Sequence, residues 1–299
     1  MSASADTIVF ALPGNEALAA ALAANPGAET GALAMRRFPD GETYLRFDST
    51  VRGRQVILAC SLHQPDDKAL SLLFAAATAR ELGATRVGVA APYLGYMRQD
   101  KRFQDGEAVT SALFAKLLSQ HIDWLVTVDP HLHRWHSLDQ IYSVPSTVIP
   151  AAPLLAAWIK AHVEAPVLIG PDAESEQWVS AVAAIAGAPH VVLEKIRRGD
   201  RDVSVSIPDP AALRGRTPVL VDDIISTGRT MAAAVRHVMA QGFNAPVCVG
   251  VHAVFSGDAH AALLAAGAAR VVTTDTIPHP SNGISVHQVM AKAVAALPN

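Results

Sequence analysis

Two adjacent aspartates, Asp222 and Asp223, stand between an apolar run and a loop rich in hydroxyl groups. The run at 219–221 is apolar on both faces, which is typical of a central strand in a parallel sheet covered by helices. A helix is expected over 230–240, and the free N–H groups at the start of a helix favour an anion. Ligands of such sheets bind beyond the carboxyl ends of the strands. The loop residues expected at this anion site are Ser226, Thr227, Gly228, Arg229 and Thr230.

The carboxylates of Asp222 and Asp223 cannot serve a phosphate directly. Two carboxylates at the end of a buried strand are costly unless they have a partner. Their oxygen atoms suit a vicinal diol or a Mg²⁺ ion carried by the ligand. A phosphate, a diol and a metal ion together describe a ribose 5-phosphate group. The alternative is an ordinary capped helix with both acids in solvent.

Basic side chains that could bind phosphate groups follow two other expected strands. Arg98 comes after a strand at 86–91; its planar fork suits a phosphate, and it can also stack on a base. Lys195 and Arg197 follow an apolar strand at 191–194, in a polar loop that could close over phosphate groups and stabilise their negative charge. The alternatives are a surface ion pair for Arg98 and a solvated basic hairpin for the other two.

Three histidines, His131, His133 and His136, follow a strand expected at 124–128. Their alternate spacing could place two imidazoles on one face and bind zinc. No cysteine or second acid cluster lies nearby in the sequence, so a structural zinc site is disfavoured. We therefore expect His133 and His136 to be surface or packing residues.

The whole chain alternates strand-like and helix-like segments, which predicts an α/β fold. We expect two domains, 1–148 and 149–299, each with a mainly parallel central sheet flanked by helices; the last helix can pack on the first domain. Further strands are expected at 7–11, 34–38, 43–47, 55–59, 167–169, 203–207, 218–221, 247–251 and 270–274. Further helices are expected at 16–24, 66–82, 109–120, 154–162, 174–186, 259–265 and 285–296.

Composition excludes several classes of protein. The 299 residues have a net charge of −3, which argues against a broad nucleic-acid-binding face. No apolar run is long enough to span a bilayer, and the first residues lack the features of a secretory signal. Cys60 and Cys248 lie in apolar strand-like runs, so we expect buried thiols in a reducing compartment. The expected location is the cytoplasm.

The segment around Asp222 resembles the motif for phosphoribosyl diphosphate (PRPP) that type I phosphoribosyltransferases share with PRPP synthetases. Alone it leaves these two families open, and other segments favour the synthetases. These resemble the synthetases' adenine-side loop at 37–42, their ATP-binding stretch at 92–100, their Asp-x-His metal segment at 127–131, a second metal-side aspartate at 170–172, and the Lys-x-Arg of their catalytic loop at 194–197. The matches follow the order of the family over nearly the whole chain.

The resemblance implies two phosphoribosyltransferase-like domains and transfer of diphosphate from Mg²⁺-bound ATP to ribose 5-phosphate, which yields PRPP and AMP. It also implies a homo-oligomer, because a neighbouring subunit contributes the adenine-side loop in that family. The implied catalytic residues are Lys195 and Arg197, and the metal-side residues are His131 and Asp172. The implied ATP-binding residues are Phe38, Asp40, Glu42, Arg98, Gln99, Asp100 and His131. The implied residues for ribose 5-phosphate are Asp222, Asp223, Ser226, Thr227, Gly228, Arg229 and Thr230.

The sequence also departs from the family pattern. Glu174 and Ser175 occupy positions where the family usually has a glycine pair, and Ser226 replaces a frequent aspartate. The departure at Glu174 leaves open a regulatory homologue with little catalytic activity. A phosphoribosyltransferase that consumes PRPP is the other alternative, although Arg98 and the loop with Lys195 and Arg197 argue against it.

Overall fold

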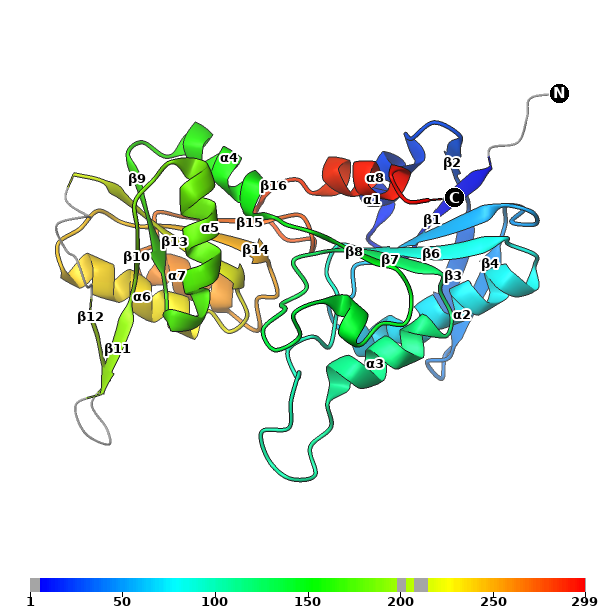
Figure 1. The fold of residues 1–299 in the computed structure, drawn as a ribbon, viewed down its shortest axis with the longest axis horizontal. Helices are drawn as coiled ribbons and strands as arrows, with labels where there is room; N and C mark the ends of the chain where they lie inside the picture. Colours follow the sequence, from blue (N-terminus) through cyan, green and yellow to red (C-terminus); the bar gives the residue numbers. More distant parts are fainter. Residues whose placement is uncertain (1–5, 198–202, 207–214, 299) are drawn as a thin grey trace. The chain divides into compact units, whose positions relative to one another are not determined.

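The computed structural model describes residues 6–197, 203–206 and 215–298. It divides the chain into two compact units. One comprises Met1–Ile149 together with Val286–Asn299, and the other comprises Pro150–Ser285 (Figure 1). Each unit has a six-stranded sheet of its own.

The sheet of the first unit has the order β2-β1-β5-β6-β7-β8, and all its neighbouring strands run parallel. Its strands are β1 (Thr7–Ala11), β2 (Ala28–Thr30), β5 (Gln55–Ala59), β6 (Arg86–Ala91), β7 (Trp124–Val128) and β8 (Ser146–Ile149). Apolar side chains alternate between the two faces of these strands, so both faces need a cover. Helices α2 (Ala69–Glu81) and α3 (Thr110–Ser119) cover one face. Helices α1 (Glu16–Ala23) and α8 (His287–Ala295) pack on each other and cover the opposite face (Figure 1).

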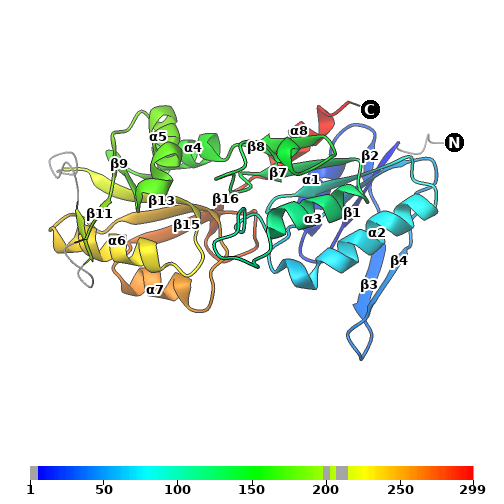
Figure 2. The same cartoon turned by 60° about the horizontal axis from the view of Figure 1, so that its bottom comes forward.

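An antiparallel hairpin projects from the first unit (Figure 2). It consists of β3 (Leu33–Arg37) and β4 (Thr43–Phe47), whose last paired residues are Arg37 and Thr43. Phe47 anchors its base, because its ring meets that of Phe10 edge to face at 4.7 Å. The hairpin therefore presents the turn at 38–42 away from the sheet.

The sheet of the second unit has the order β10-β9-β13-β14-β15-β16 and is also parallel. Its strands are β9 (Pro166–Gly170), β10 (His190–Val192), β13 (Thr217–Ile224), β14 (Val247–His252), β15 (Arg270–Thr274) and β16 (Asn282–Ile284). Its helices are α4 (Ala152–His162), α5 (Glu176–Ala186), α6 (Arg229–Ala240) and α7 (Ala259–Ala265). A separate antiparallel pair, β11 (Glu194–Arg197) and β12 (Val203–Ser206), completes the unit. The expected fold class is thus confirmed.

Several expected elements were wrong in extent. The helix expected at 66–82 is a 3₁₀ turn, η1 (Pro65–Asp67), followed by α2, and Lys68, with a φ of −118°, separates the two. The strand expected at 191–194 is two strands, since β10 pairs with β9 whereas β11 pairs with β12. Two other 3₁₀ turns are η2 (Leu138–Gln140) and η3 (Ala173–Ser175). The short strands β2, β8 and β16 were not expected.

Two further expectations concern burial and membranes. Cys60 and Cys248 are free and buried, as expected. In the part of the chain that the structure describes, no helix combines the length and apolar character needed to cross a membrane.

A half-buried basic pair lies beyond the carboxyl end of β5. The Nζ atom of Lys68 lies 2.9 Å from Nδ1 of His63 and donates to the carbonyl oxygen of Ser61 at 2.9 Å. Burial, and secondly the charge of Lys68, lower the pKa of His63 from its ordinary 6.5 to about 4. The folded protein therefore keeps this imidazole neutral at a pH where the unfolded chain has already taken up a proton.

The His63→Gln variant should lose less stability than the parent when the pH falls from 6.5 to 4. A depressed histidine pKa contributes stability that is present above the unfolded value and lost as pH falls through the folded value. Because His63 is only half-buried, we expect the two proteins to differ by about 2 °C in this loss. Thermal unfolding at both pH values measures it, with His136→Gln as an exposed control; equal losses in all three proteins would contradict the assignment.

Candidate functional site

Asp222 and Asp223 belong to the last residues of β13. The expected strand ended at 221, which was wrong: pairing with β14 continues through Asp222 opposite Gly250 and Ile224 opposite His252. The apolar run ends at Val221, but the main-chain ladder does not depend on side-chain type and goes on. Both aspartates are half-buried. They therefore lie at the carboxyl edge, with their backbones fixed by the sheet.

A third carboxylate, that of Asp172, follows the neighbouring strand β9. Burial raises the pKa of Asp222 well above its ordinary value, and the charges of Asp223 and Asp172 raise it further. The N–H of Asp223 donates to Oδ1 of Asp222 at 3.0 Å and offsets part of this cost. Crowded carboxylates of this kind favour a cation or a hydroxyl-rich ligand at the sheet edge.

These carboxylates do not make a complete metal cage. Among the described residues, no group of three or more His, Cys, Asp or Glu side chains is arranged to hold a metal ion. His131 and Asp172, the two expected metal-side residues, belong to different units. A metal ion at the edge of β13 would therefore need oxygen ligands from its substrate and from water, which suits Mg²⁺.

The loop after β13 leads into the N-terminus of α6. Gly228 is the N-cap of this helix and has a φ of 65°, a left-handed conformation that favours glycine. A Cβ atom on Gly228 would also lie 3.4 Å from Ala259. The helix begins at Arg229, one residue before the expected start, so Arg229 and Thr230 form part of its first turn. The exposed first turn leaves backbone N–H groups for an anion.

The segment after β14 holds this loop in place. The N–H of Ser256 donates to the carbonyl oxygen of Ser226 at 3.0 Å, and that of Phe255 donates to Ile225 at 2.8 Å. Thr227, in contrast, is exposed. The loop is thus fixed through its backbone while the side chain of Thr227 can meet a ligand.

The departure at Ser175 has a structural explanation, whereas the side chain of Glu174 has none. Oδ1 of Asp172 accepts from the N–H of Glu174 at 3.2 Å, and Oγ of Ser175 donates to the carbonyl oxygen of Asp172 at 2.5 Å. Ser175 is buried and fills the space beside Gly170, whereas Glu174 is exposed. The sequence thus closes this turn with side-chain hydrogen bonds.

In the first unit, the segments after β6 and β7 lie along one edge, because these strands are neighbours. Arg98 is exposed and Gln99 is half-buried, while the side chain of Asp100 is largely buried. Asp129 and His131 have positive φ values of 32° and 54°, and the N–H of His131 donates to the carbonyl oxygen of Asp129 at 2.8 Å. Such backbone conformations are costly for non-glycine residues and are frequent at functional sites.

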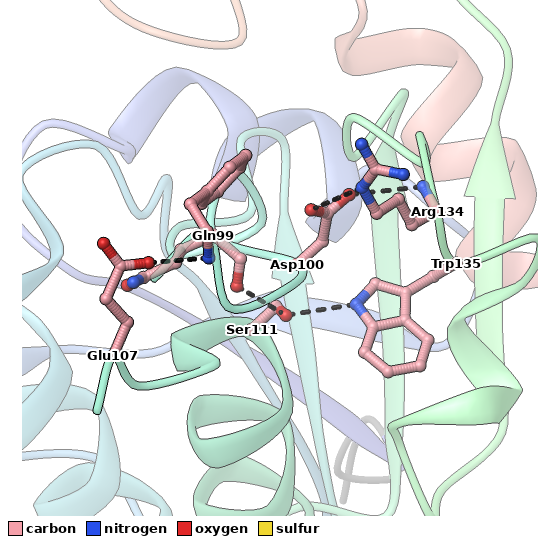
Figure 3. A network of polar contacts seen from close by, with 7 residues as sticks. Gln99, Asp100, Glu107, Ser111, Arg134 and Trp135 are labelled. Atoms are coloured by element: carbon pink, nitrogen blue, oxygen red, sulfur yellow. Dashed lines mark hydrogen bonds and ion pairs between the residues drawn. The ribbon is translucent and has the colours of Figure 1, made fainter. Parts of the chain in front are cut away.

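Direct contacts join these two segments. The N–H of Arg134 donates to Oδ2 of Asp100 at 3.2 Å, and its Nε lies 3.6 Å from Oδ1 (Figure 3). The sequence did not predict a role for Arg134. The rings of His131 and His133 are 6.2 Å apart, and His133 and His136 are exposed, as expected.

The turn of the hairpin carries Phe38, Asp40 and Glu42, and all three are exposed. Oδ1 of Asp40 accepts from the N–H of Glu42 at 3.2 Å, which shapes the turn. The guanidinium of Arg36 lies 4.5 Å from the ring centre of Phe38 and 4.4 Å from that of Tyr44. Sequence reasoning missed Arg36, although its position two residues before Phe38, within the strand expected at 34–38, was a usable signal.

Lys195 and Arg197 lie on a strand and not in a loop, which corrects the sequence prediction. Lys195 pairs with Val205 and Arg197 with Val203, so the two basic residues occupy alternate positions of β11. The strand expected at 203–207 is present as β12, and its pairing with 194–197, which was not expected, makes that segment a strand. The polar stretch 198–202 lies outside the described residues.

Comparisons with known proteins cover both units. A family model of the N-terminal domain of ribose phosphate pyrophosphokinase matches residues 7–121, and a model of the phosphoribosyl transferase domain matches residues 137–287. A ribose-phosphate pyrophosphokinase of Methanopyrus kandleri is 35% identical and aligns with 97% of this chain and 99% of its own. One of Methanothermobacter thermautotrophicus is also 35% identical, over 86% of this chain and 88% of its own.

A solved structure agrees with these relatives. The phosphoribosylpyrophosphate synthetase from Mycobacterium smegmatis superposes with a TM-score of 0.84 and 26% identity, over 97% of this chain and 98% of the other. The resemblance found in the sequence motifs is thereby confirmed. By sequence and by fold, over nearly its whole length, this chain belongs to the ribose-phosphate pyrophosphokinase family.

Proposed function

We propose that this chain transfers the diphosphate group of ATP to the 1-hydroxyl of ribose 5-phosphate, which yields 5-phosphoribosyl 1-diphosphate and AMP. The observation that carries the proposal is the crowding of Asp172, Asp222 and Asp223 at the sheet edge from which α6 starts. Carboxylates beside an anion-binding helix start suit a ligand with hydroxyls or a cation at one end and a phosphate at the other.

The second unit takes the sugar phosphate in this proposal. The carboxylates of Asp222 and Asp223 accept hydrogen bonds from the ribose hydroxyls. The first turn of α6 and the hydroxyl of Thr227 bind the 5-phosphate. Because β13 and the fixed loop position these groups in advance, binding requires little ordering of the chain.

The first unit takes ATP. Arg98 binds its phosphate groups, Gln99 and Asp100 form the wall beside them, and His131 acts through a phosphate or a bound water. Phe38, Asp40 and Glu42 come from a neighbouring subunit and bind the adenine, with the ring of Phe38 supported by Arg36.

Mg²⁺ fits the charge of this site, because a cation relieves the repulsion that raises the pKa of Asp222. When bound, it neutralises phosphate charge and orients the phosphate groups for in-line transfer. Asp172 and His131 are the residues of this chain that we place beside it. Lys195 and Arg197 stabilise the negative charge that shifts during transfer.

One assay separates this proposal from its rivals. Incubation with ATP, ribose 5-phosphate and Mg²⁺ should yield AMP and PRPP in equal amounts, and Asp222→Asn combined with Asp223→Asn should yield neither. A phosphoribosyltransferase would instead consume PRPP and a free base without ATP. A regulatory homologue would bind nucleotide without turnover, and either result would refute the proposal.

We also propose a homo-oligomer in the cytoplasm. Free, buried cysteines agree with a reducing compartment. The first unit exposes two apolar pairs, Leu70 with Phe74 on α2 and Leu113 with Leu117 on α3, which agree with burial against another subunit.

If two subunits build each ATP site, inactive variants should complement each other. In a dimer of Phe38→Ala and Arg98→Ala subunits, one site keeps both native residues, so random pairing should restore roughly a quarter of the parent activity. Co-refolding followed by the PRPP assay measures it. A mixture of Phe38→Ala and Glu42→Ala, which damage the same half, should stay inactive; a fully active monomer would refute the shared site.

A further inference from the structure

Gln99 is held at both its backbone and its side chain by the first turn of α3. Oγ of Ser111 donates to the carbonyl oxygen of Gln99 at 3.0 Å, and the N–H of Ser111 donates to the same oxygen at 3.3 Å. Oγ1 of Thr110 donates to Oε1 of Gln99 at 3.2 Å. Because Oε1 accepts this hydrogen bond, Gln99 keeps its NH₂ group as a donor.

Trp135 connects this turn with the segment after β7. Its Nε1 donates to Oγ of Ser111 at 3.1 Å (Figure 3). Ser111 is 1% exposed, and its hydroxyl both accepts from Trp135 and donates to Gln99. Loss of either partner would therefore leave a buried polar atom without its hydrogen bond, which is costly.

The residue after Gln99 and the residue before Trp135 make a second connection. Asp100, whose side chain is only 7% exposed, contacts the N–H and the guanidinium of Arg134. Residues 101–109 lie between Gln99 and α3 as an excursion from the sheet (Figure 1). The carboxylate of Glu107 accepts from the N–H groups of Phe103 and Gln104, so this excursion folds back on itself. Its two ends meet at the hydrogen bonds between Gln99 and Ser111.

We propose that Ser111 and Trp135 are positioning residues for the nucleotide. They fix Gln99, and with it the adjacent Arg98, at a set separation from the segment that carries His131. This inference rests on the proposed function, in which Arg98, Gln99 and His131 bind ATP. Neither positioning residue touches the nucleotide; both act through Gln99.

The test compares Ser111→Ala, Trp135→Phe and the double variant in steady-state kinetics. Each single change should raise the KM for ATP roughly three- to tenfold, the effect of one lost neutral hydrogen bond. The KM for ribose 5-phosphate should stay within about twofold, because that site belongs to the second unit. The double variant should be no worse than the more affected single variant, since both changes break one chain of hydrogen bonds.

The matched control is Trp158→Phe, which removes an indole N–H from the second unit and should leave the KM for ATP unchanged. Lower thermal stability with both KM values unchanged would assign the network a structural role only and overturn the inference. Equal rises in both KM values would do the same. Calorimetric titration with ATP alone gives the affinity without turnover, so the inference is tested even if the enzyme makes no PRPP.

Discussion

Replacement of Lys195 or Arg197 by alanine lowers the turnover number at least roughly a hundredfold, because each removes a positioned cation that stabilises charge in the transition state. The effect on the KM for ribose 5-phosphate should be smaller. Both residues belong to β11, where pairing with β12 fixes their backbones. Steady-state production of AMP from ATP and ribose 5-phosphate measures the change.

Lys160→Ala is the control for a general loss of positive charge in the second unit, since Lys160 is exposed on α4. It should retain full turnover. Near-normal turnover in both the Lys195 and the Arg197 variant would remove the β11–β12 pair from the mechanism.

Thr227→Val raises the KM for ribose 5-phosphate by roughly ten- to a hundredfold, since loss of one donor to a charged group costs on the order of 1.5–3 kcal/mol. The KM for ATP should change by no more than a few-fold. The backbone of the loop is held by the segment after β14, so the variant keeps the shape of the site. Unchanged sugar dependence with weakened ATP binding would show that the two substrates have been assigned to the wrong units.

Asp223→Asn, in contrast, should weaken the binding of both the sugar and Mg²⁺. The same change should raise the temperature of thermal unfolding without ligands, because the charge of Asp223 contributes to the raised pKa of Asp222. Lower activity with higher stability is the expected combination, and unfolding scans with and without Mg²⁺ measure it. A variant that loses both would indicate structural damage.

The central architecture could be predicted because its signal is local. Apolar runs at β5, β13 and β14 are continuous, and helices between them indicate parallel strands. The strands β2, β8 and β16 have only three or four residues and carry little apolar pattern, so pairing with a neighbour defines them. The extension of β13 through both aspartates had the same origin in the main-chain ladder.

In the candidate site, too, local signals could be read from the sequence, whereas contacts between distant segments could not. Motif residues such as Arg98 and Asp222 could be found because their types and positions after strands carry the signal. The contact between Ser111 and Trp135 spans 24 residues and exists because β6 and β7 are neighbours, which no local pattern encodes. Likewise, Lys195 and Arg197 were assigned to a loop because their partner strand lies beyond a polar stretch.

The return of α8 to the first unit has a consequence for synthesis of the chain. The second unit is one continuous segment, whereas the first is completed only by Val286–Asn299. During synthesis, α1 and its face of the sheet therefore lack their cover until α8, the last helix of the chain, has been made. Deletion of Val286–Asn299 should thus destabilise the first unit, although the deleted residues follow the second unit directly in the sequence. The second unit should keep its stability.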